Sequence, residues 1–165
     1  LEISFFVWYY SPKPINRTFE GIAYQLGEEN KGVIEPVLIH VNGEFKRNFD
    51  TTKTITGRMD IEEEGEIPIP YDKRELTIRL SDQSGIISYF EHGFKSHFYG
   101  SIYINSDLTE LTIAKYTPHP ENPNRSGWNG RDGLMISAPA SSREEALHIS
   151  NELMKPHYRG MNLLK

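Results

Sequence analysis

A chain of 165 residues has room for one ordinary domain but not for two independent hydrophobic cores. Its formal net charge of -5 makes it acidic, which removes the electrostatic reason to approach phosphate backbones and excludes nucleic acid as an expected partner. The chain has no cysteine, P-loop, dinucleotide fingerprint, serine-hydrolase elbow or H-E-x-x-H segment, so disulfides, thiolate metal sites and the common cofactors are not expected.

The N-terminal segment, residues 1–14, has two interpretations. Residues 3–10 are apolar on both alternating faces and are followed by Ser11-Pro12-Lys13-Pro14. A buried strand shows such a pattern. The outer end of a membrane anchor shows it too, with the aromatic residues in an interfacial belt and the prolines as a stiff stalk, although a bilayer takes about 20 apolar residues to span.

We favour the anchor, because Trp8, Tyr9 and Tyr10 cluster at the end nearest the prolines. This interpretation expects further apolar residues before Leu1 and an extracytoplasmic, membrane-anchored domain. The strand interpretation instead expects the aromatic side chains in the core, and it leaves a cytoplasmic location open. The missing cysteines are compatible with export but do not require it.

Residues 15–165 are expected to form a single β-rich domain, in which two segments share one pattern. Residues 55–61 and 98–104 alternate apolar or glycine positions with polar ones, and Glu-Leu-Thr-Ile follows each of them, from Glu75 and from Glu110. Residues 19–23 are a weaker third copy. We interpret these segments as half-buried strands whose glycines permit sharp bending or close approach, and an internal duplication is a hypothesis.

Turn residues suggest how the strands connect. Asn42-Gly43 predicts a hairpin between residues 37–41 and 44–47, and a second tight hairpin is expected at residues 105–108. Further strands are expected at residues 76–80, 85–90, 111–116 and 134–138. About nine strands result, and a twisted sheet of that size curls or splits. The predicted fold is therefore mostly β (α+β), an antiparallel curved sheet, barrel or sandwich.

One C-terminal amphipathic helix is expected at residues 142–155. Ser142 can cap its first backbone N–H groups, with Glu145 completing a capping box. An apolar stripe that includes Ala146 and Ile149 predicts packing on the sheet, and Pro156 ends the helix.

The segment 117–133 is too long for a hairpin turn, and loops of such length are often functional. It carries aromatic surface and charge that suit ligand recognition, in the residues His119, Arg125, Trp128, Arg131 and Asp132. The binding interpretation requires a partly exposed Trp128, whereas the simpler alternative is a surface loop with Trp128 folded back onto the core. Residues 122–127 imitate a calcium loop, but Asn122 and Gly133 stand where carboxylates should close the shell.

Two other clusters have weaker support. The carboxylates of residues 60–66 could hold a hard cation, but we interpret this run as a solvated turn. Glu91, His92 and His97 could hold zinc or transfer protons, although the spacing of the two histidines differs from that of helical zinc motifs. We therefore prefer a non-enzymatic binding or accessory domain that presents the 117–133 loop to a protein, peptide or envelope ligand. The alternative is a small metal-dependent or acid/base enzyme.

Overall fold

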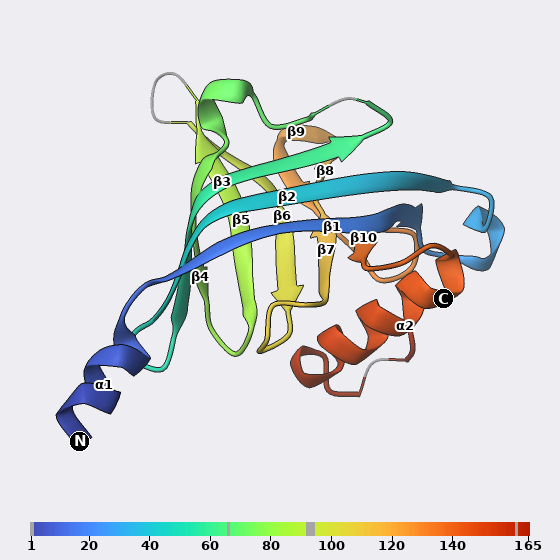
Figure 1. Cartoon of the computed structure of the whole chain (residues 1–165). Helices are drawn as coiled ribbons and strands as arrows, with labels where there is room; N and C mark the ends of the chain where they lie inside the picture. The colour runs from blue at the N-terminus through green and yellow to red at the C-terminus, as the bar shows by residue number, and fades with distance from the viewer. Residues whose placement is uncertain (1, 66, 92–94, 161) are drawn as a thin grey trace.

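The computed structural model describes residues 2–65, 67–91, 95–160 and 162–165. Over these residues the chain forms ten strands, eight of which make one curved and nearly closed antiparallel sheet, while the other two make a small separate hairpin (Figure 1). The strands are β1 (Lys13–Gln25), β2 (Ile34–Arg47), β3 (Lys53–Glu63), β4 (Glu75–Leu80), β5 (Ser84–Phe90), β6 (Ser96–Ile104), β7 (Leu111–Lys115), β8 (Thr117–His119), β9 (Asn122–Gly127) and β10 (Leu134–Ala138).

The strand order is β4-β3-β2-β1-β10-β7-β6-β5, so almost every strand pairs with its neighbour in the sequence. β10 closes the sheet by pairing with β1 on one side and β7 on the other. β4 and β5 are the two end strands of this order. The turn between them joins these strands through a β-bridge between Ser81 and Ser84. The predicted antiparallel curved sheet is confirmed, and its form is that of a nearly closed up-and-down barrel.

Alternating side chains fill the inside of the barrel, because successive residues of a strand point to opposite faces. Aliphatic side chains dominate, and several of them are fully buried: Ile39, Ile61, Ile87, Ile102, Ile113 and Ile136. The interior is thus a packed core.

The C-terminal helix, α2 (Arg143–Met154), agrees with the predicted bounds to within one residue. The Ser142 hydroxyl accepts a hydrogen bond from the Glu145 backbone N–H at 3.2 Å, which is the predicted N-cap. Ala146, Ile149 and Met154 are buried, and the helix covers the outer face of β1, β10 and β7 (Figure 1). Beyond it lies a short 3-10 turn, η3 (Lys155–His157); two others are η1 (Glu28–Asn30) and η2 (Tyr71–Lys73).

The hairpin predicted at Asn42-Gly43 is wrong, since β2 runs straight through these residues. Gly43 lies opposite Gly57 of β3, and a Cβ on Gly43 would come within 2.7 Å of the Gly57 Cα atom. The two glycines therefore serve a close approach of two curved strands rather than a turn. The tight hairpin expected at residues 105–108 does form, with the Leu108 N–H donating to the Asn105 carbonyl at 3.1 Å.

The repeated pattern forms strands in β3 and β6, but the alternation fails at the start of the second copy. Phe98 is 45% exposed although the pattern predicts it as a core residue. The register of β5 and β6 is irregular between Ile87 and Ser88. The β6 side chains opposite this point, including Phe98, therefore switch to the other face of the sheet.

Residues 3–10 belong to an α-helix, α1 (Glu2–Tyr10), and not to a strand. β1 then begins at Lys13, so the expected proline stalk is partly strand. Pro14 fits there because β1 pairs only with β2 at this level, while β10 pairs with residues 22–25 of β1. A proline without an N–H is tolerated where one side of a strand has no ladder.

Candidate functional site

The α1 helix presents apolar side chains around its circumference and contains no buried residue. Its exposed large side chains are Ile3, Phe5, Phe6, Val7, Trp8 and Tyr9, with Ile3 81% exposed. The helix projects from the end of the barrel where β1 begins, which we call the α1 end (Figure 1). Among the described residues, none of the helices has the length and apolar character needed to cross a membrane.

A loop of the barrel extends this apolar surface. Phe49, in the turn between β2 and β3, is 74% exposed, and its ring lies 5.8 Å from that of Phe6 and 4.5 Å from that of Tyr10. The turn is well ordered by its own hydrogen bonds, since the Asn48 amide donates to Thr52 Oγ1 at 3.0 Å. The turn therefore fixes the Phe49 side chain in an exposed position beside α1.

Two cations lie against the aromatic rings of α1. The Lys13 ammonium is 3.3 Å from the centre of the Trp8 ring, and the Arg47 guanidinium is 4.7 Å from that of Tyr9. Apolar and aromatic groups next to basic side chains are typical of surfaces at a membrane interface.

The segment 117–133 lies at the opposite end of the barrel, the hairpin end (Figure 1). Its first part forms the exposed β8–β9 hairpin. His119, Arg125 and Trp128 line one open cavity of about 330 Å³, so the structure brings three of the five predicted residues together. Arg131 and Asp132 lie outside this cavity, in a turn where their backbone N–H groups donate to Asn129 Oδ1 at 2.9 and 3.1 Å.

Trp128 is half-buried and joins the cluster of side chains beneath α2, with its ring 6.4 Å from that of Tyr158. Its indole N–H is buried and has no acceptor among the described atoms. Gly133 makes room for the ring, because a Cβ there would lie 2.3 Å from the indole nitrogen. Each of the two interpretations of this loop is therefore partly correct for Trp128. Part of the ring packs on the domain, and part of it faces the cavity.

Residues 122–127, which imitate a calcium loop in sequence, form β9 and have an extended backbone. In an extended strand the alternate side chains that would supply the oxygen ligands share one face but are spaced about 6.6 Å apart along it, so their oxygen atoms do not converge on one point. This backbone adds to the missing carboxylates as a reason against calcium binding.

Glu91 and His97 lie on opposite sides of the β5–β6 connection, with 3.7 Å between Glu91 Oε1 and His97 Nδ1. The His97 ring also stacks on Tyr89, at 4.8 Å between ring centres. His92 lies outside the described residues. Within the described part of the chain, no three metal-ligating side chains lie around one point where they could hold a metal ion.

A polar group inside the barrel was missed by sequence reasoning. Glu63 accepts hydrogen bonds from the Tyr99 hydroxyl and from the Lys115 ammonium, both at 2.6 Å. Burial, followed by the Glu63 charge, raises the pKa of Tyr99 well above its ordinary value. The signal in the sequence was the position of Glu63, two residues after the inward-facing Ile61. The solvated-turn interpretation is wrong for residues 60–63, which belong to β3, whereas Glu64 lies in an exposed turn and Glu66 lies outside the described residues.

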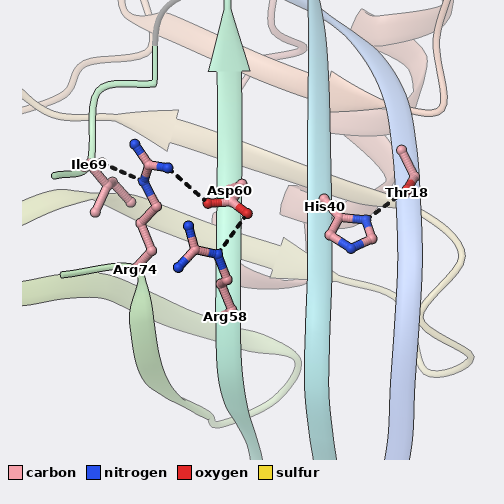
Figure 2. Close-up of polar contacts among 6 residues, drawn as sticks. All are labelled: Thr18, His40, Arg58, Asp60, Ile69 and Arg74. Carbon is pink, nitrogen blue, oxygen red and sulfur yellow. Dashed lines mark hydrogen bonds and ion pairs between the residues drawn. The ribbon is translucent and has the colours of Figure 1, made fainter. Parts of the chain in front are cut away.

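Figure 2 shows a polar row on the outer face of β1, β2 and β3, where Thr18, His40 and Asp60 are in register. Thr18 Oγ1 and His40 Nδ1 share a hydrogen bond of 2.8 Å. The two Asp60 oxygens accept from Arg58 Nε at 3.0 Å and from Arg74 Nη1 at 3.3 Å. The Asp60 carboxylate thus binds the two arginines and does not orient the His40 imidazole. The row therefore does not have the hydrogen-bond arrangement of a catalytic triad.

The chain matches no known protein-family model, no curated protein and no solved structure. Function therefore has to be inferred from the chemistry of these surfaces.

Proposed function

We propose that this chain is a non-enzymatic binding or accessory domain that α1 attaches to a membrane on the extracytoplasmic side, and that its β8–β9 hairpin recognises a protein, peptide or envelope ligand. The observation that carries the proposal is α1 itself, a helix with apolar side chains on all sides and no buried residue. Such a helix needs an apolar environment outside the domain. The hairpin lies at the other end of the barrel, where it would face away from the bilayer (Figure 1).

Flotation with phosphatidylcholine vesicles tests the attachment. The 165-residue chain should float with the vesicles, and the double variant Phe5→Ser/Trp8→Ser should remain in the soluble fraction. The matched control is Phe90→Ser/Phe98→Ser, which removes two exposed aromatic side chains elsewhere on the barrel. Equal flotation of both double variants would show that α1 is not the attachment site.

The side of the membrane can be tested because the chain contains no cysteine. A Gly32→Cys variant places a thiol in an exposed turn where a Cβ meets no atom within 4 Å. A membrane-impermeant maleimide should label this variant on intact cells. Labelling only after lysis would instead support the cytoplasmic alternative.

Ligand recognition is tested by co-sedimentation with a cell-envelope fraction of the source organism, after detergent removal of its lipid. His119→Ala/Arg125→Ala removes two polar side chains from the cavity and should weaken retention. Glu121→Ala/Asn122→Ala alters the tip of the same hairpin, outside the residues that line the cavity, and should retain binding. If both variants bind as the unaltered chain does, the hairpin cavity is not the recognition site.

The enzyme alternative rests on the short distance between Glu91 and His97. Protein purified without chelator should contain no stoichiometric zinc. If the protein contains one zinc ion per chain and His97→Ala removes it, the chain would instead be a metal-dependent enzyme, and the binding proposal would be wrong.

A further inference from the structure

An open cavity of about 420 Å³ lies at the α1 end, between α1 and the mouth of the barrel. Three cations line it: Lys13 and Arg17 from β1, and Arg47 from the end of β2. Strand alternation places all three on the inner face, with Lys13 and Arg47 beyond the core residues Ile15 and Phe45, and Arg17 between Ile15 and Phe19. The cavity is therefore basic although the chain as a whole has a net charge of -5.

The cations are held in place by neutral groups. Lys13 lies over the Trp8 ring, Arg47 lies over the rings of Tyr9 and Phe45, and Arg17 Nη1 donates to the Leu108 carbonyl at 2.8 Å. None of the three forms an ion pair with a carboxylate among the described residues. Their remaining N–H groups are available to an anion.

One carboxylate, Asp107, also lines the cavity. It accepts a hydrogen bond from the Thr109 hydroxyl at 2.6 Å. That hydrogen bond, with a smaller contribution from Arg17, lowers the pKa of Asp107 below its ordinary value, so it carries its negative charge at neutral pH. Three cations against this one anion leave the cavity with a net positive charge.

We infer that this cavity binds the phosphate of an anionic phospholipid headgroup. Guanidinium groups recognise phosphate through paired N–H donors, and Trp8 and Tyr9 supply the aromatic groups that favour the headgroup level. The inference rests on the proposed attachment of α1 to a membrane, which would bring the cavity to the bilayer surface.

The first test compares binding of the full 165-residue chain to phosphatidylcholine vesicles with and without phosphatidylglycerol. Phosphatidylglycerol should increase binding, and Arg17→Gln/Arg47→Gln should remove most of that increase, because a site-bound phosphate loses both of its guanidinium donors. The matched control is Lys46→Gln/Lys53→Gln, which removes two charges at the same end but outside the cavity. A purely diffuse attraction would make the two double variants lose binding equally, and this result would overturn the inference.

A second test uses soluble probes and the fluorescence of Trp8. In a Trp128→Phe background, Trp8 is the sole tryptophan, because the chain has two. Short-chain phosphatidylglycerol below its micellar concentration should change this fluorescence, whereas short-chain phosphatidylcholine and inorganic phosphate should bind at least tenfold more weakly. Asp107→Asn should tighten phosphatidylglycerol binding severalfold, and this gain cannot result from loss of folding.

The outcomes separate the two proposals. Equal binding of the unaltered chain to both kinds of vesicle would overturn the preference for an anionic headgroup and leave the membrane attachment standing. Binding to neither would overturn both. Inorganic phosphate that binds as tightly as short-chain phosphatidylglycerol would overturn the lipid assignment in favour of a small-anion site.

Discussion

The Tyr99 hydroxyl donates a 2.6 Å hydrogen bond to Glu63, and so links β6 to β3 across the interior of the barrel. The other Glu63 oxygen accepts from the Lys115 ammonium, also at 2.6 Å. The two charged side chains are only 13% and 19% exposed, so each is largely removed from water. A charge in such a place is costly once it loses its partner.

Replacing Lys115 should therefore destabilise the fold. Lys115→Met leaves Glu63 without its cation and should cost about 2 to 3 kcal/mol, less than the loss of a partner in a fully buried pair because some solvent contact remains. The control is Lys31→Met, whose partner Glu28 is exposed, so that its loss should change the unfolding free energy far less. Urea unfolding measures both values, and similar costs would show that the interior ion pair is no more important than a surface pair.

Alkaline pH should destabilise the protein through its buried tyrosines. Burial is the main cause that raises the pKa values of Tyr24, Tyr99 and Tyr103 above the ordinary 10.0. Above about pH 10 the unfolded chain loses these protons while the folded chain keeps them, so stability is complete below that pH and falls as the pH rises. Each tyrosine should contribute a slope of up to about 1.4 kcal/mol per pH unit.

This pH dependence can be assigned to one residue. Tyr99→Phe removes one of the buried hydroxyls and should make the alkaline decline in unfolding free energy shallower by one proton. The comparison is the unaltered chain, which keeps all of these hydroxyls. Identical slopes for the variant and the unaltered chain, measured by urea unfolding between pH 8 and about pH 11.5, would contradict the assignment.

The glycine pair in the curved sheet gives a third prediction. Gly57 has φ of 147°, and a Cβ there would lie 2.4 Å from both the Asn42 carbonyl oxygen and the Gly43 Cα atom. Gly57→Ala should cost about 2 kcal/mol or more, because backbone atoms would have to move. Gly32→Ala, where a Cβ meets nothing within 4 Å, should change stability by less than about 0.5 kcal/mol. Thermal unfolding of the two variants measures the difference.

The same glycines show where sequence reasoning ends. β10 and α2 were predicted closely, because alternation and helix capping are encoded by residues near one another in the chain. Asn42-Gly43 is a strong local hairpin signal, but its role is decided by Gly57, which lies in a different strand. Local turn chemistry was overridden by a contact between strands.

The candidate sites divide in the same way. His119, Arg125 and Trp128 come from one segment and could be proposed from its length and composition, and they line one cavity. The interior group formed by Glu63, Tyr99 and Lys115 depends on the register of β3, β6 and β7, which the sequence does not reveal. The contact of Phe49 with α1 likewise joins segments whose proximity is known only from the fold.

Removal of α1 gives the last prediction. Deleting residues 1–11 should change the unfolding free energy by less than about 1 kcal/mol, because α1 buries no residue and its contacts with the barrel are those of exposed rings and cations. Deletion should stop before Lys13, since β1 begins there and the removal of strand residues would be a different experiment. Ile15→Ala, which truncates a core side chain that is 6% exposed, should cost about 2 to 4 kcal/mol and shows that the urea assay detects core damage. The shortened chain should also fail to float with phosphatidylcholine vesicles. A shortened chain that cannot be obtained folded would mean that α1 contributes to the core of the domain, and the proposed role of α1 as a dispensable membrane attachment would be wrong.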